Sequence, residues 1–261
     1  MALADEFDGL LVDLDGVVWV GREPVPGSPE ALRELIEGGV EVVFVTNNPG
    51  RAASVYAERL REAGIPVGED RIVTAGMVTA TLAAERAGAG AGCFVIGAPA
   101  FKDAVAAAGL ELLDLAAGRG ARAVVVSGHR AFDYEELLTA TLALQRGAML
   151  FATSRDPTLP MPGGAWPGTG AILAAVETAT GAVAEIGGKP ERHLFDLARK
   201  AIPGAGRVAI VGDRISSDVE GGRRAGLVTV LVLSGASSRA EAEAAADPPD
   251  HVVDDLAALL R

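Results

Sequence analysis

The stretch LLVDLDG, residues 10–16, decides the fold class, because a short apolar run ends there in two aspartates and a glycine. Similar runs recur along the chain, and each ends in polar or glycine residues: 40–45, 123–126, 207–211 and 227–233. Runs that are apolar on both faces are typical of buried parallel strands.

Segments with helical periodicity lie between these runs. One of them carries Leu32, Leu35 and Ile36 after Ser28-Pro29, a plausible cap with proline at the first helical position, and it ends at Gly38-Gly39. The alternation of strands and helices predicts an α/β fold with a mainly parallel, Rossmann-like sheet. Ligands of such sheets bind at the carboxyl ends of the strands, so we look for the site there.

The stretch between Asn48 and Lys189 is far longer than one crossover between parallel strands needs. It also contains strand and helix patterns of its own. We therefore expect a discontinuous core, residues 1–77 and 186–261, and an inserted α/β cap domain, residues 78–185.

Composition excludes several classes of protein. The 261 residues carry 23 Lys and Arg against 35 Asp and Glu, a formal net charge of −12, and only 4% are aromatic. Such a chain should repel nucleic acids and anionic membranes. The single cysteine, Cys93, excludes an intramolecular disulfide and a multi-cysteine zinc site. No signal-peptide pattern and no apolar run near the ~20 residues of a membrane span occurs, so we expect a soluble cytoplasmic protein.

Asp13 and Asp15 follow the first predicted strand. Residues two apart in an extended chain project on one side, roughly 6–7 Å apart. Two carboxylates this close repel each other unless a cation lies between them, and Mg²⁺ favours oxygen ligands. The simpler interpretation is a pair of turn-forming aspartates at a strand end.

Thr46-Asn47-Asn48-Pro49 follows the second strand. A hydroxyl and backbone amides at a strand-to-helix junction suit a phosphate oxygen. The simpler interpretation is an Asx-type turn that ends at proline.

Two later segments add one lysine and two more acids. In Gly187-Gly188-Lys189-Pro190 the proline suits the first helical position, which would put Lys189 at a helix N-terminus. A cation is a poor partner for that end of a helix, which hints at an anion bound nearby. Asp213 and Asp218 follow the strand predicted over 207–211. Each segment read alone is equally consistent with a surface turn or a capped loop.

Taken together, the four segments resemble the haloacid dehalogenase superfamily of phosphohydrolases. The matching elements are Asp13-Leu14-Asp15-Gly16, Thr46-Asn47, Lys189-Pro190 and Gly212-Asp213 with Asp218, and the resemblance covers essentially the whole chain. The segment 153–181, with Arg155-Asp156-Pro157, resembles the NagD-like branch, which includes p-nitrophenyl phosphate, phosphoglycolate, glycerol phosphate and pyridoxal phosphate phosphatases.

The resemblance implies a mechanism. Asp13 is the nucleophile that forms an aspartyl-phosphate, and Asp15 is the general acid and later the base. Both belong to the implied Mg²⁺ site, Asp15 through its backbone carbonyl. Two further residues complete that site, Asp213 as a ligand and Asp218 as a ligand or a supporting group. The phosphoryl oxygens are implied to be bound by residues of the second and third segments: Thr46, Asn47, Asn48 and Lys189.

The resemblance implies a Mg²⁺-dependent phosphatase of small phosphate monoesters, such as phosphoglycolate or glycerol phosphate. The dehalogenases of the superfamily lack an aspartate at the position of Asp15. We expect Arg155 and Asp156 of the cap to contact the substrate, although a rim loop without substrate contact is the simpler interpretation. Pyridoxal phosphate or a nucleoside monophosphate remains an alternative substrate. A phosphomutase or phosphotransferase and a non-enzymatic phospho-acceptor domain are less favoured. In this branch the cap surface can also serve a homodimer.

Overall fold

The computed structural model describes residues 2–161 and 164–261, and this part of the chain divides into two compact units. The first unit comprises Met1–Thr46, Ala53–Val73 and Lys189–Arg261. The second comprises Asn47–Ala52 and Thr74–Gly188. The second unit therefore interrupts the sequence of the first at two places, with a short segment before α2 and a long one that begins at the end of β5.

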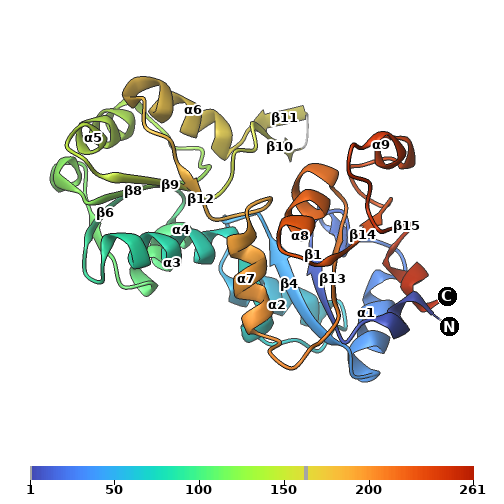
Figure 1. Ribbon diagram of the computed structural model, residues 1–261. Helices are drawn as coiled ribbons and strands as arrows, with labels where there is room; N and C mark the ends of the chain where they lie inside the picture. Colours follow the sequence, from blue (N-terminus) through green and yellow to red (C-terminus); the bar gives the residue numbers. More distant parts are fainter. Residues whose placement is uncertain (1, 162–163) are drawn as a thin grey trace. The chain divides into compact units, whose positions relative to one another are not determined.

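The first unit is built on a six-stranded sheet in the order β15-β14-β13-β1-β4-β5 (Figure 1). Parallel pairing joins β1 to β4 and to β13, and continues from β13 through β14 to β15. The chain starts at β1, adds strands on one side, and later adds strands on the other. The order therefore reverses between β1 and β13, which is where ligands of open α/β sheets bind. The strands are β1 Gly9–Asp13, β4 Glu41–Thr46, β5 Ile72–Thr74, β13 Val208–Gly212, β14 Val228–Val232 and β15 His251–Val253.

Helices of the first unit cover this sheet. Leu10 and Val12 of β1 point to one face and share a buried core with α1 and α2. Helix α1 begins at Ser28 with Gly27 as its N-cap, one residue before the predicted start, and it ends before Gly38 as predicted. The helices are α1 Ser28–Glu37, α2 Ala53–Glu62, α7 Arg192–Lys200, α8 Glu220–Arg224 and α9 Arg239–Ala244, and a short hairpin is formed by β2 Trp19–Val20 and β3 Glu23–Pro24.

The second unit has its own five-stranded sheet, in the order β12-β9-β8-β6-β7 with parallel pairing throughout. Successive residues of β8 face opposite sides: Val124 and Val126 pack towards α5 and α6, whereas Val125 packs towards α3 and α4 (Figure 1). The strands are β6 Gly92–Ile96, β7 Glu111–Leu113, β8 Ala123–Val126, β9 Met149–Ala152 and β12 Glu185–Ile186, with a hairpin of β10 Thr158–Met161 and β11 Gly164–Pro167. The helices are α3 Ala75–Ala87, α4 Pro99–Ala107, α5 Tyr134–Gln145 and α6 Thr169–Thr180.

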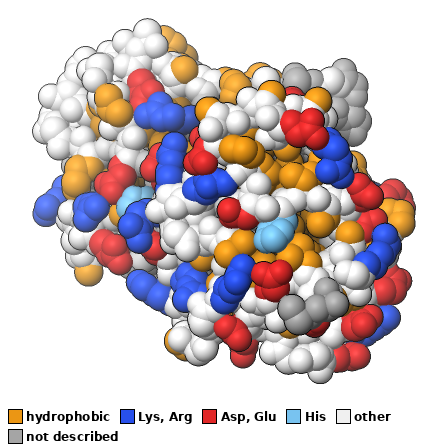
Figure 2. Space-filling view, turned by 45° about the vertical axis from the view of Figure 1, so that its right-hand side comes forward, with side chains coloured by type: hydrophobic (Ala, Val, Ile, Leu, Met, Phe, Trp, Pro, Cys, Tyr) orange, Lys and Arg blue, Asp and Glu red, His pale blue; other side chains and the backbone are white. Residues whose placement is uncertain are grey.

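This architecture confirms the predicted fold class, an α/β protein whose Rossmann-like core sheet is interrupted in sequence by a second α/β unit. Among the described residues, no helix combines the length and the apolar character needed to span a bilayer. Acidic and basic side chains are interspersed over the face shown in Figure 2. On that face, the net negative charge of the chain is not gathered into one acidic patch.

Candidate active site

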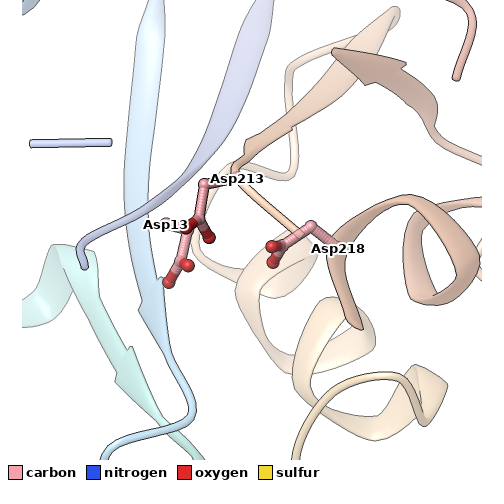
Figure 3. A group of neighbouring side chains, drawn as sticks. All are labelled: Asp13, Asp213 and Asp218. Carbon is pink, nitrogen blue, oxygen red and sulfur yellow. The ribbon is translucent and has the colours of Figure 1, made fainter. Parts of the chain in front are cut away.

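Three buried aspartates meet at the carboxyl ends of the central strands of the first unit. Asp13 ends β1, Asp213 follows β13 directly, and Asp218 lies one short loop further on. One carboxylate oxygen of each lies within 4.8 Å of those of the other two (Figure 3). The cluster lies beside the point where the strand order reverses, as the rule for such sheets predicts.

Lys189 is the cation of this cluster. Its Nζ lies 2.8 Å from Oδ1 of Asp13 and 2.6 Å from Oδ1 of Asp218, and the side chain is almost fully buried. Burial would lower the pKa of Lys189, but the two carboxylates outweigh it and raise the pKa above its usual value. One ammonium thus faces three carboxylates, which leaves two negative charges uncompensated when all three are ionised.

The pKa values of the aspartates reflect this excess of negative charge. Burial raises the pKa of Asp13 well above its ordinary value; Lys189 opposes that shift, and the other two carboxylates add to it. Burial and the charge of Asp218 raise the pKa of Asp213 to about 6. A group that stabilises the ionised carboxylates is therefore needed if all are to be charged at neutral pH.

The loops around Asp213 leave one of its oxygens free. Oδ2 accepts a hydrogen bond of 2.7 Å from the amide of Ala236, whereas the buried Oδ1 has no hydrogen-bond partner among the described residues. A Cβ atom at Gly16 or Gly235 would overlap Oδ2, and Gly16 also has a positive φ of 87°. Glycine is required at these positions because the backbone closes directly on the carboxylate.

Asp218 is fixed by the backbone that carries it. It lies in a single π-helical turn, Ile215–Val219, a feature that is frequent at functional sites. Its Oδ2 accepts hydrogen bonds from the amide of Arg214 at 3.0 Å and from the hydroxyl of Ser217 at 3.3 Å. Oδ2 of Asp218 therefore bonds to the surrounding loop, whereas Oδ1 bonds to Lys189.

Asp15 lies apart from this cluster. Its side chain is exposed, and Oδ1 accepts a hydrogen bond of 3.0 Å from the indole Nε1–H of Trp19. Sequence reasoning did not single out Trp19. The one available signal was its position, four residues after Asp15.

The Thr46–Asn48 segment leaves the end of β4. Thr46 is buried at the last position of that strand, and β4 pairs directly with β1. Asn47 and Asn48 belong to the second unit. The side-chain oxygen of Asn48 accepts a hydrogen bond of 3.0 Å from the amide of Gly50, which is an Asx-type turn. The side-chain oxygen of Asn47 lies 2.7 Å from the position a Cβ would take at Gly188.

The predicted position of Lys189 at a helix N-terminus is wrong. Helix α7 begins at Arg192 with Glu191 as its N-cap, so Pro190 is not the first helical residue. The ammonium is instead drawn to the buried carboxylates of Asp13 and Asp218, whose charge fixes it more strongly than a helix end would.

Arg155 and Asp156 belong to the second unit. The guanidinium of Arg155 forms a two-pronged ion pair with Glu177 of α6, at 2.9 and 2.8 Å, and donates to the carbonyl of Ala184 at 3.4 Å. Asp156 is exposed, and its backbone carbonyl accepts a hydrogen bond from Gly170. These contacts tie Arg155 to α6 and to the segment that follows it. Substrate binding by Arg155 or Asp156 stays a prediction.

The donor set of the aspartate cluster suits a hard divalent cation. It consists of carboxylate oxygens, and its three carboxylates face one ammonium. Within residues 2–161 and 164–261, the buried Oδ1 of Asp213 has no hydrogen-bond partner. Fold and site together define an α/β protein with a candidate divalent-cation site at the switch point of its core sheet.

Comparisons with known proteins agree with this class. The family model for haloacid dehalogenase-like hydrolases matches residues 10–111, and a related HAD-hydrolase-like model matches residues 186–259. The chain is 36% identical to glycerol-3-phosphate phosphatase of Gallus gallus, over 99% of this chain and 93% of that protein. It is similar to the crystal structure of glycerol phosphate phosphatase from Mycobacterium tuberculosis in complex with magnesium, with a TM-score of 0.91, 35% identity, and coverage of 100% of this chain and 78% of that one. It is also similar to the p-nitrophenyl phosphatase from Archaeoglobus fulgidus, with a TM-score of 0.89, 33% identity, and coverage of 97% and 98%.

The chain therefore belongs to the haloacid dehalogenase-like hydrolases, and within them to the NagD-like branch that contains these phosphatases.

Proposed function

We propose that this protein is a Mg²⁺-dependent phosphatase of small phosphate monoesters that works through an aspartyl-phosphate on Asp13. The observation that carries the proposal is the buried group of Asp13, Asp213, Asp218 and Lys189 at the switch point of the sheet. Relatives over nearly the whole chain are named phosphatases, which supports the same reaction class.

Three carboxylates, those of Asp13, Asp213 and Asp218, are the side chains that would hold Mg²⁺. The backbone carbonyl of Asp15 is the fourth protein ligand that the family pattern gives. The bound ion supplies positive charge that keeps the carboxylates ionised and offsets the charge of the phosphoryl oxygens.

The reaction then proceeds in two displacements. In the first, an oxygen of Asp13 forms a bond to phosphorus, the bond from phosphorus to the leaving oxygen breaks, and Asp15 gives that oxygen a proton. In the second, Asp15 takes a proton from water as the water oxygen attacks phosphorus. The bond to Asp13 then breaks, and inorganic phosphate leaves.

The remaining polar groups bind the phosphoryl oxygens. The hydroxyl of Thr46, the backbone amide of Asn47 and the ammonium of Lys189 carry hydrogen-bond donors suited to charge that spreads over these oxygens. Asn48 supports this segment through its turn with Gly50. Because Lys189 is already ion-paired with Asp13, it fixes the nucleophile as well.

We propose that the first unit, which the sequence placed at residues 1–77 and 186–261, is the catalytic core, and that the second unit, which the sequence placed at residues 78–185, is the cap. The whole of α3 and of β12 lies in the second unit. The second unit has a sheet and two hydrophobic layers of its own, which supports its role as a separate folding unit. A cap of this size suits a small substrate that must be enclosed from water. Arg155 and Asp156 are the cap residues that we propose for substrate contact. A homodimer and a cytoplasmic location stay predictions.

Glycerol phosphate is the first candidate substrate, because two of the similar proteins are named for it. A nucleoside monophosphate is the second candidate, because the chain is 31% identical to the 5'-nucleotidase YutF of Bacillus subtilis, over 96% of both chains. Phosphoglycolate and pyridoxal phosphate belong in the same substrate class.

A phosphate-release screen over these four esters and p-nitrophenyl phosphate tests the proposal. We expect multiple turnovers in MgCl₂, a strong preference within the panel, and no turnover in excess chelator. A protein that becomes stably phosphorylated without releasing phosphate is a phospho-acceptor domain, and one that moves the phosphoryl group to a second alcohol is a phosphotransferase. Either result would overturn the proposal.

A further inference from the structure

The chain turns sharply between Asp15 and Trp19. The backbone amide of Trp19 donates to the carbonyl of Leu14 at 3.2 Å, and the amide of Gly16 donates to the carbonyl of Trp19 at 2.7 Å. An isolated bridge pairs Asp15 with Trp19. The turn therefore brings Trp19, the first residue of the β2–β3 hairpin, back beside the end of β1.

The side chains of these two residues differ in exposure. Trp19 is 2% exposed, among the largest fully buried side chains of the described chain, whereas Asp15 is exposed. The indole has a single polar group, Nε1–H, and its 3.0 Å hydrogen bond goes to Oδ1 of Asp15. A rigid, buried donor thus holds one oxygen of the Asp15 carboxyl group, which forms no other side-chain hydrogen bond within the described part of the chain.

Arg59 of α2 fixes the indole in turn. The central guanidinium carbon lies 3.8 Å from the centroid of the Trp19 ring, which is a cation–π contact. The same guanidinium donates a hydrogen bond of 2.8 Å to the carbonyl of Gly21, in the turn of the β2–β3 hairpin. Arg59 therefore ties both the ring and the hairpin to α2.

We propose that Trp19, stacked on Arg59, is a positioning residue that orients the carboxyl group of Asp15 for proton transfer. This inference rests on the proposed function, in which Asp15 gives a proton to the leaving oxygen while the bond from phosphorus to that oxygen breaks. With one oxygen held by the indole, the other stays available for the transfer. The carboxylates of Asp13, Asp213 and Asp218 take no part in this hydrogen bond.

Two substrates with different leaving groups can show whether Trp19 positions Asp15 or only stabilises the fold. An alkoxide leaves poorly without a proton, so hydrolysis of an alkyl phosphate depends on Asp15. A p-nitrophenolate leaves readily without one. A positioning residue for Asp15 should therefore matter for glycerol phosphate and matter little for p-nitrophenyl phosphate.

The experiment measures kcat/KM for both esters in the wild type and in Trp19→Phe, which keeps a buried ring and removes only the indole donor. Because general acid catalysis contributes typically 10²–10⁴-fold, we expect loss of orientation to lower kcat/KM for glycerol phosphate about tenfold. The value for p-nitrophenyl phosphate should change less than about threefold, since that reaction needs little acid assistance.

Two further comparisons support the measurement. In an Asp15→Asn background, Trp19→Phe should cause no further loss for either ester, because the group that it positions is gone. Arg59→Met keeps Trp19 in place and should reproduce the selective loss more weakly. Arg61→Met is its matched control, because Arg61 lies on the same helix and donates to the carbonyl of Val67 instead.

The possible outcomes are distinct. Equal losses for the two esters in both Trp19→Phe and Arg59→Met, or an undiminished loss in the Asp15→Asn background, would show that Trp19 only fills the core. If the wild type hydrolyses neither these esters nor the others of the panel, the proposed function itself fails.

Discussion

The two units share an architecture but differ in the charge that they bury. Each is built on a parallel sheet against which helices pack. Among the described residues, the buried polar side chains of the second unit are serines and threonines, whereas the first unit buries four charged groups: Asp13, Lys189, Asp213 and Asp218. The fold alone therefore does not locate the chemistry; the buried charges do.

The largest effect is expected from Asp13→Asn, which removes one of the buried charges that distinguish the first unit from the second. The amide cannot act as the nucleophile, so we expect turnover to fall by at least about 10³-fold for every ester. Burial raises the pKa of Asp13, so its ionised form destabilises the fold at neutral pH, and the neutral amide should leave the melting temperature in chelator unchanged or higher. Substantial remaining activity would refute the assignment of the nucleophile.

Lys189→Met should harm both activity and stability. The variant leaves three buried carboxylates without their cation, and breaking a buried ion pair in this way costs about 3–5 kcal/mol. Lys200→Met, at the exposed C-terminal end of α7, is the matched control and should leave both properties near the wild-type values. Equal melting temperatures for the two variants in chelator would contradict the ion-paired cluster.

The stability of the metal-free protein should fall as the pH rises. Asp213 has a pKa of about 6 when folded, against 3.8 ordinarily, so the folded protein binds this proton more tightly than the unfolded chain does. The stabilisation that protonated Asp213 gives the folded protein is complete below pH 3.8 and is lost as the pH rises through about 6. Melting curves in chelator at pH 5 and pH 7.5 measure this loss.

Added MgCl₂ should reverse that loss. Cations bind ionised carboxylates, so the gain in melting temperature should be larger at pH 7.5 than at pH 5. A protein with Asp213→Asn should show a smaller dependence on both pH and MgCl₂. A gain that is equal at both pH values would contradict a cation held by these carboxylates.

The smallest effects are expected in the second unit. Arg155→Met should change the ranking of the esters more than it changes the rate on p-nitrophenyl phosphate, if Arg155 contacts the substrate. Glu177→Gln weakens the same ion pair but keeps the guanidinium, and it should cost about 0–1 kcal/mol because the pair is partly exposed. If both variants alter the ranking alike, Arg155 acts through Glu177 and not on the substrate.

Apolar runs in the sequence predicted β1, β4, β13 and β14 of the first sheet, but only β8 of the second sheet. Residues 123–126 were expected as a strand and form β8 with the same bounds, and the run 227–233 forms β14 at Val228–Val232. The start of α1 was predicted to within one residue and its end correctly, because proline and glycine mark its two ends. These elements follow local rules, and local rules can be read from one sequence.

Contacts that depend on how the chain folds back in three dimensions were not predictable in the same way. Lys189 was expected at a helix start, but its position depends on Asp218, a partner 29 residues away. Helix α7 and strand β13 lie between the two residues in the sequence. The hydrogen bond from Trp19 to Asp15 depends on how the turn after β1 folds back. The cation–π contact depends on α2, which brings Arg59 to the Trp19 ring. Such contacts depend on tertiary packing, and the hydrophobic periodicity of the sequence does not predict them.

The central claim is that the buried carboxylate of Asp13 carries the phosphoryl group during turnover. Rapid acid quenching of the protein with p-nitrophenyl phosphate and MgCl₂, followed by peptide mass mapping, tests it most directly. We expect one phosphoryl group on the peptide that contains Asp13, present during turnover and lost once the substrate is consumed. Release of inorganic phosphate at the full rate with no phosphorylated peptide, or a phosphoryl group on another residue, would contradict the account.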